Sequence, residues 1–113
     1  MTDLTSNDIG TAINRLAETI DARANVDPSQ SYSAKLLSEG ASRCAKKFGE
    51  EAIELSIAGA LGDKAEISNE AADVLYHLMV LLKASGVEPA RVARVLQERE
   101  KQSGLAEKAS RNS

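Results

Sequence analysis

The sequence has few of the residues that build common metal and redox sites. Among its 113 residues there is one cysteine, one histidine and no tryptophan. One such chain cannot supply the three or four nitrogen or sulfur ligands of a zinc site, so zinc fingers and zinc hydrolases are excluded. It cannot form an internal disulfide either, which agrees with a reducing compartment. We interpret Cys44 as a small buried packing residue.

Aromatic side chains, excess positive charge and long apolar runs are also lacking. The three aromatic residues, Tyr32, Phe48 and Tyr76, are too few to form a base-stacking platform for a nucleic acid, and the net charge of −3 opposes a phosphate backbone. The longest apolar stretch, 74–82, is short and interrupted by His77, and the first residues lack a basic segment. We therefore expect a cytoplasmic protein with no nucleic-acid or membrane partner.

Apolar residues instead recur at helical spacing along most of the chain, and no stretch alternates with the period of two that marks a strand. The expected helices cover residues 8–23, 32–39, 42–60, 64–84 and a segment that begins at Pro89. This pattern predicts an all-α fold, and the length predicts one domain. We place that domain at residues 1–98 and expect residues 99–113 to be a polar tail that frays.

The third and fourth expected helices are similar in length and are joined by a short turn that contains Gly59 and Gly62. Helices joined in this way pack antiparallel as a hairpin. The apolar face of the expected helix 42–60 holds Cys44. We expect the apolar face of the helix 64–84 to be buried. The residues assigned to that second face are Ile67, Ala71, Val74, Leu78 and Leu82.

Four acidic residues lie on or beside these apolar faces. They form the pattern Glu51-x-x-Glu54, then fifteen residues, then Glu70-x-x-Asp73. Residues three apart share one side of a helix, so each pair directs two carboxylates toward one place, and the hairpin can bring the two pairs together. Buried carboxylates repel one another unless a cation balances them. Oxygen ligands of this kind suit Mg²⁺ or Mn²⁺.

Other interpretations of these residues stay open. Glu-x-x-Glu alone usually marks a solvated helix face, which Lys46 and Lys47 can neutralise; the same lysines can instead offer charge to substrate phosphates. Gly49 indicates close approach of a helix, a ligand or a metal-bound water, since glycine inside a helix costs about 1 kcal/mol relative to alanine. His77 is interpreted as a packing residue in preference to a proton carrier.

Three segments resemble a known family. They are the stretch from Ser31 to Leu37, the Cys-Ala-Lys-Lys-Phe-Gly-Glu-Glu sequence that ends at Glu51, and the Glu-Ala-Ala-Asp-Val-Leu-Tyr-His sequence that begins at Glu70. Together they resemble the phosphoribosyl-ATP pyrophosphatases, a branch of the MazG-like all-α nucleotide pyrophosphatases. The resemblance runs from about residue 4 to residue 98.

The resemblance implies hydrolysis of phosphoribosyl-ATP to phosphoribosyl-AMP and pyrophosphate, the second step of histidine biosynthesis, by a Mg²⁺-dependent homodimer. It implies that Glu51, Glu54, Glu70 and Asp73 are the metal ligands. Glu50 or one of the ligands would accept the proton of the attacking water, so all five acids are candidate catalytic residues. The candidate phosphate-binding residues are Lys35, Lys46 and Lys47.

Two alternative functions are compatible with the same residues. A MazG-like house-cleaning pyrophosphatase would keep the carboxylates but act on damaged or surplus nucleoside triphosphates. A helical dimerisation module without enzymatic activity would carry them merely as solvated acids.

Overall fold

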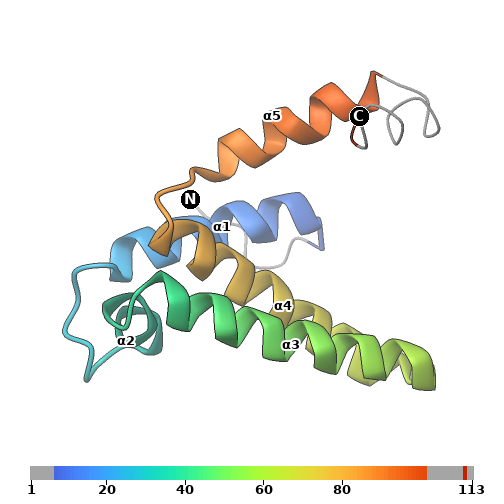
Figure 1. The fold of residues 1–113 in the computed structure, drawn as a ribbon, viewed down its shortest axis with the longest axis horizontal. Coiled ribbons are helices and arrows are strands. Elements are labelled where there is room, and N and C mark those ends of the chain that lie inside the picture. Colours follow the sequence, from blue (N-terminus) through green and yellow to red (C-terminus); the bar gives the residue numbers. More distant parts are fainter. Residues whose placement is uncertain (1–6, 102–110, 112–113) are drawn as a thin grey trace.

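The computed structural model describes residues 7–101 and residue 111, and this part of the chain is built from helices without strands (Figure 1). The helices are α1 (Ile9–Arg23), α2 (Tyr32–Ser38), α3 (Ala41–Leu61), α4 (Lys64–Ala84) and α5 (Pro89–Glu100). The all-α prediction is confirmed. Each predicted helix end agrees with the observed one within about one residue. Most of the predicted polar tail, residues 99–113, lies outside the described residues.

The α3–α4 hairpin is the main element of the fold, and its two helices run antiparallel, side by side (Figure 1). Gly62 ends α3 in the left-handed conformation, with φ of 75°, which glycine adopts without steric cost. The Asp63 side chain then accepts hydrogen bonds from the backbone N–H groups of Ala65 and Glu66 and so caps α4. The turn is therefore sharp and locally specified, which fixes how α3 and α4 align.

A small core joins the open end of the hairpin to α1 and α2. Ile20, Leu36, Cys44 and Val80 contribute its most completely buried side chains. The Cys44 thiol donates a hydrogen bond to the carbonyl oxygen of Leu36 at 3.3 Å, which ties α3 to α2. The interpretation of Cys44 as a buried packing residue is confirmed.

The buried side of α4 differs from the predicted one. The five residues from Ile67 to Leu82 that were assigned to a buried face are only half-buried, whereas His77, Met79 and Val80 are buried. The reason is that the core formed with α1 and α2 is centred on Met79 and Val80, and Leu78 and Leu82 pack only against its edge. Burial of His77 agrees with its interpretation as a packing residue.

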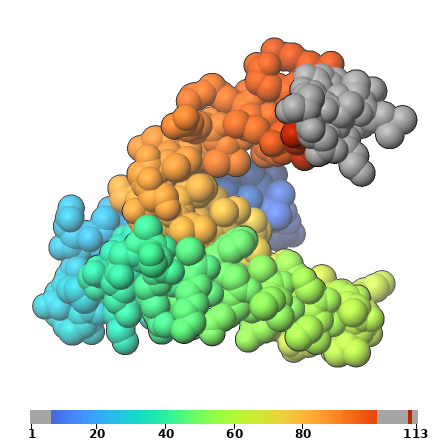
Figure 2. All heavy atoms as spheres, in the orientation of Figure 1, coloured from blue at the N-terminus to red at the C-terminus, as the bar shows by residue number. Residues whose placement is uncertain are grey.

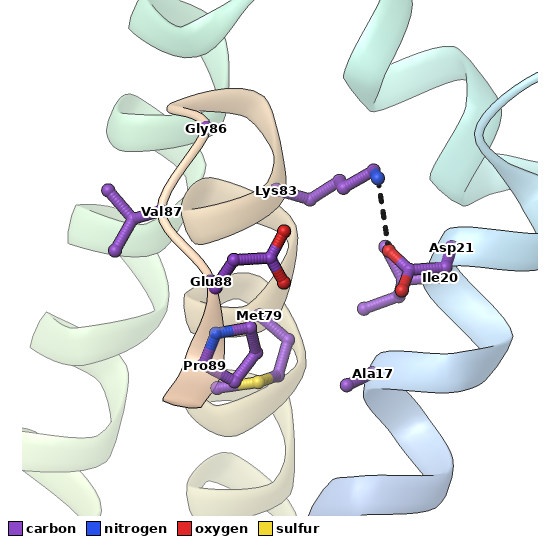
Figure 3. Close-up of a pocket in the computed structure, with 9 residues that line it drawn as sticks. All are labelled: Ala17, Ile20, Asp21, Met79, Lys83, Gly86, Val87, Glu88 and Pro89. Atoms are coloured by element: carbon purple, nitrogen blue, oxygen red, sulfur yellow. Dashed lines mark ion pairs between the residues drawn. The ribbon is translucent and has the colours of Figure 1, made fainter. Parts of the chain in front are cut away.

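The last helix stands apart from the hairpin. After Pro89, α5 extends along the α1 side of the molecule, and none of its residues is buried (Figures 1 and 2). A small cavity of about 70 Å³ lies where α5 begins, between α1 and α4. Lys83 and Asp21 form an exposed ion pair at 3.1 Å on its rim (Figure 3). Exposed pairs of this kind contribute at most about 1 kcal/mol, so this pair adds little to the packing of α1 against α4.

None of the described helices combines the length and the apolar character needed to cross a membrane.

The short helix α2 depends on its amino-terminal cap. The Ser31 side chain, which is nearly buried, accepts a hydrogen bond from the backbone N–H of Ala34 at 3.2 Å. We expect Ser31→Ala to lower the free energy of unfolding by about 1 kcal/mol, because that N–H loses its partner. The measurement is urea denaturation followed by circular dichroism. Ser38→Ala is the matched control, since its exposed hydroxyl only donates to the carbonyl of Lys35, and a loss of equal size there would contradict the capping role.

Candidate functional site

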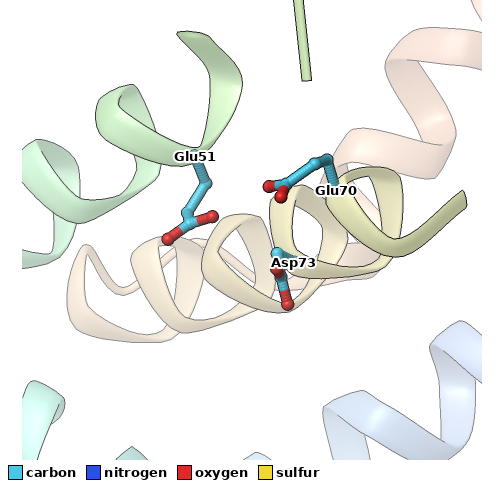
Figure 4. Close-up of side chains that lie close together, drawn as sticks. All are labelled: Glu51, Glu70 and Asp73. Atoms are coloured by element: carbon cyan, nitrogen blue, oxygen red, sulfur yellow. The ribbon is translucent and has the colours of Figure 1, made fainter. Parts of the chain in front are cut away.

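Three carboxylates from the two helices of the hairpin converge at its centre. Glu51 lies on α3, and Glu70 and Asp73 lie on α4 (Figure 4). One carboxylate oxygen of each residue lies within 4.8 Å of the oxygens of the other two. Glu51 and Glu70 are half-buried and Asp73 is exposed, so the cluster opens to solvent on the Asp73 side. The structure thus brings together three of the four predicted ligands.

The fourth, Glu54, borders the cluster. Its side chain is exposed, and it interacts with both Glu51 and Glu70 through charge and hydrogen bonding. Partial burial, followed by the nearby charge of Glu54, raises the pKa of Glu70 and of Glu51 above the ordinary carboxyl value. The fold therefore holds these acids where their ionised forms are disfavoured unless a cation is present.

The cluster fits a divalent cation that prefers oxygen ligands. One carboxylate oxygen of Glu70, Oε2, is buried and has no hydrogen-bond partner among the described residues. A buried polar atom without a partner costs free energy, and a bound cation or its water would satisfy it. With one oxygen of each carboxylate within 4.8 Å of the other two, the three side chains could contribute ligands to one such cation. No nitrogen or sulfur ligand belongs to the cluster, which favours Mg²⁺ or Mn²⁺ over zinc.

The other predicted site residues surround the cluster at different distances. Lys47 is near enough that its charge acts on Glu51 and on His77, whereas Glu50 is exposed and acts on His77. Lys46 is exposed on α3, and Lys35 is exposed near the end of α2. The structure therefore places Lys47 beside the carboxylates, while Glu50, Lys35 and Lys46 lie outside the three-residue cluster.

A hollow of about 220 Å³ adjoins the carboxylates on the side of the α3–α4 turn. Glu54 and Glu70 line one end, and Ile57 and Leu61 supply apolar walls. Asp63 and Glu66 complete the lining with negative charge, so this side does not attract phosphate. The sequence pattern did not point to this hollow.

A cluster of aromatic rings lies on the opposite side of the carboxylates and was also not predicted. Tyr32 of α2 stacks on Tyr76 of α4, with ring centroids 6.2 Å apart and an interplanar angle of 17°. His77 meets both rings edge-on, at 6.3 Å from Tyr32 and 5.1 Å from Tyr76. The hydroxyls of Ser33 and Tyr76 are hydrogen-bonded. Ser33 and Tyr76 are 43 positions apart, and no local pattern signals that contact.

Comparisons with known proteins agree with this arrangement. The family model described as phosphoribosyl-ATP pyrophosphohydrolase matches residues 13–100. A phosphoribosyl-ATP pyrophosphatase of Methylobacterium radiotolerans is 58% identical over 96 residues, which are 85% of this chain and 90% of that protein. One from Cereibacter sphaeroides is 54% identical over 101 residues, 89% of this chain and 98% of that protein. One from Paracoccus denitrificans is 52% identical over 101 residues, 89% and 94% of the two chains.

The family match spans α2, α3 and α4, which carry the carboxylates and the lysines, and the relatives align over most of their own length. The resemblance proposed from the sequence is confirmed, and it favours the phosphoribosyl-ATP interpretation over the house-cleaning alternative. By this match and by its all-helical fold, the chain belongs to the phosphoribosyl-ATP pyrophosphohydrolase family.

Proposed function

We propose that this protein hydrolyses phosphoribosyl-ATP to phosphoribosyl-AMP and pyrophosphate, the second step of histidine biosynthesis, in the cytoplasm. The single observation that carries the proposal is the carboxylate cluster of Glu51, Glu70 and Asp73 in a chain of this family. An acidic cluster alone repels a triphosphate, so the cluster requires bound cations to act on this substrate. We therefore include Mg²⁺ in the proposal, with Mn²⁺ as a substitute.

The proposed metal ligands are Glu51, Glu54, Glu70 and Asp73. When bound, Mg²⁺ lowers the pKa of water and polarises phosphoryl oxygens. The chain contributes a fixed set of carboxylates, which would hold the cation where the α-phosphate of the substrate can bind it. In the reaction, a water oxygen bonds to the α-phosphorus, and the bond from that phosphorus to the oxygen bridging to the β-phosphate breaks, releasing pyrophosphate.

Residues outside the three-residue cluster handle the proton and the phosphate charge. We assign Glu50 as the acceptor of the water proton, because it is exposed, directly precedes Glu51 and is not one of the proposed metal ligands. We assign Lys47 to offset negative charge that develops on the phosphates, an assignment supported by the action of its charge on Glu51. We assign Lys35 and Lys46, which are exposed, to the more distant phosphates of the substrate.

The test is pyrophosphate release by the purified protein with Mg²⁺, for phosphoribosyl-ATP, ATP and a panel of canonical and modified nucleoside triphosphates. We expect kcat/KM for phosphoribosyl-ATP to exceed that for every other substrate. Preference for a modified nucleoside triphosphate would instead support the house-cleaning function. Inactivity on every substrate would reject the enzymatic proposal.

We also propose that the chain acts as a homodimer, joined through α3. Ile53, Ile57 and Leu61 are spaced four residues apart and are 64%, 55% and 79% exposed, so they form an apolar stripe along one side of the helix. The α3 flank is uncovered in the space-filling view (Figure 2). Gly49 continues the same spacing, and among the described residues no atom outside the adjacent part of its own helix would lie within 4 Å of a Cβ placed there. None of the helices α1, α2, α4 and α5 therefore makes the close approach that Gly49 indicates.

The dimer predicts a large change in assembly from one substitution. We expect wild-type protein to sediment as a dimer and Ile53→Glu to sediment as a monomer, because a buried unpaired carboxylate opposes association. The control is Leu96→Glu on α5, which replaces another exposed apolar residue, 57% exposed, and should leave the dimer intact. A monomeric wild-type protein at micromolar concentration would contradict the proposal.

A further inference from the structure

The aromatic cluster of Tyr32, Tyr76 and His77 is next to the carboxylates but has no role in the chemistry described so far. We propose that it is a binding subsite for the purine base of the substrate, with Tyr32 as the residue on which the base stacks. This inference rests on the proposed function, and it names the part of the molecule that holds the adenine end of phosphoribosyl-ATP.

The position of the cluster follows from the register of the hairpin. His77 lies one helical turn after Asp73 on α4, and the charges of Lys47, Asp73 and Glu50 all act on it. The Tyr32 ring is 6.3 Å from the His77 ring, between centroids. The tyrosine therefore lies within the length of one nucleotide of the carboxylates, on the side of the lysines and away from the acidic hollow.

The geometry of Tyr32 suits stacking. Its ring rests against Tyr76 at 6.2 Å and 17°, yet Tyr32 remains 52% exposed. Tyr76 is itself held by the hydrogen bond between its hydroxyl and that of Ser33, which is buried. Tyr32 is thus an exposed ring on a fixed support. A single ring is enough for one base, although the three aromatic residues of the chain are too few for a nucleic-acid strand.

Two further features mark this side as a place for a polar ligand. His77 is only 6% exposed, and its Nδ1 has no hydrogen-bond partner among the described residues. A buried ring nitrogen of this kind needs a polar atom, which a bound nucleotide or its water supplies. Lys35 follows Tyr32 by three residues on α2 and therefore lies on the same side of that helix. A ring and a positive charge side by side match a base that carries a phosphoribosyl group.

The kinetic test compares Tyr32→Ala with Tyr32→Phe. Loss of one base–aromatic stack should raise KM for phosphoribosyl-ATP by roughly tenfold, with kcat within about threefold of wild type, because the stack is present in both ground and transition states. Tyr32→Phe keeps a ring and should keep KM within about twofold of wild type. Unchanged KM in Tyr32→Ala would overturn the inference, as would equal effects of the two substitutions.

A second readout does not need turnover. With two tyrosines, one phenylalanine and no tryptophan, the aromatic NMR spectrum is simple, and Tyr32→Phe identifies the Tyr32 signals. We expect saturating phosphoribosyl-AMP to shift the Tyr32 ring protons and to give nuclear Overhauser contacts between them and the adenine protons. Absence of these contacts at saturation would overturn the inference.

The two proposals fail in different ways. If wild-type protein does not hydrolyse phosphoribosyl-ATP, the proposed function fails, whereas the NMR contact still tests the base subsite. If wild type is active and Tyr32→Ala dissociates the dimer in sedimentation, Tyr32 belongs to the subunit interface and the base subsite is rejected.

Discussion

Glu51→Gln and Asp73→Asn are each expected to reduce kcat/KM for phosphoribosyl-ATP by on the order of 10³-fold or more, since each removes a charge that holds the catalytic cation. The substituted side chains keep their size and keep an oxygen, so packing in the hairpin should be preserved. Glu51 is also held with a raised pKa by burial and by Glu54, which means that its ionised form opposes folding of the metal-free protein. Its neutralisation should therefore leave metal-free stability unchanged or higher.

The measurement combines steady-state pyrophosphate release with thermal denaturation in EDTA. Glu18→Gln, an exposed substitution on α1, serves as the control and should behave as wild type in both. Near-normal activity of Glu51→Gln and Asp73→Asn would reject the metal assignment. Loss of activity accompanied by loss of helicity would show instead that these residues act on the fold, so circular dichroism is recorded for each variant.

Removal of the divalent cation is expected to abolish activity and to lower stability. A ligand that binds only the folded chain at 100 times its Kd raises the free energy of unfolding by about 2.7 kcal/mol. For a domain of this size, that corresponds to an increase in Tm on the order of 10 °C. Thermal denaturation with Mg²⁺ and with EDTA measures the difference directly. An EDTA-insensitive Tm together with inactivity would favour the dimerisation module without enzymatic activity.

The increase in Tm that Mg²⁺ produces should itself become larger as the pH rises. The pKa values of Glu51 and Glu70 are raised in the fold above the ordinary 4.5, chiefly by burial. Between 4.5 and the raised values, the folded metal-free chain binds more protons than the unfolded chain, so its stability falls as pH rises through that interval. The cation requires the ionised carboxylates, so the difference in Tm between Mg²⁺ and EDTA should grow across the same interval. A difference that shrinks with rising pH would contradict this assignment.

Much of the fold and the centre of the site could be predicted because the signals are local. Helical periodicity, Gly62 and Asp63 define two helices and a short turn, and an antiparallel pair follows from them. The convergence of the acids follows as well: Glu51 and Asp73 are each eleven residues from Gly62 in the sequence, and Glu54 and Glu70 are each eight residues from it.

Which helix faces pack together, and how the aromatic cluster forms, depends on contacts between distant segments. A single sequence does not reveal such contacts. The α3 helix has two apolar stripes, one with Cys44 and one with Ile53, and periodicity does not say which of them packs within the chain. The same limit explains why the α4 residues from Ile67 to Leu82 were expected to be buried. The support of Tyr76 by Ser33 and its stacking with Tyr32 depend on where α2 docks.

The turn at Gly62 also determines which length changes the protein can tolerate. Residues equidistant from Gly62 face each other along the hairpin, as Glu54 and Glu70, Glu51 and Asp73, and Lys47 and His77 do. An insertion of one residue in this turn changes every pairing at once and turns the side chains of one helix by about 100° relative to their partners. Insertions beyond α5 leave these pairings untouched. Natural variation in length should therefore be rare between α3 and α4 and common after Glu100, and a domain fused to the carboxyl-terminal end would leave the alignment of the carboxylates unchanged.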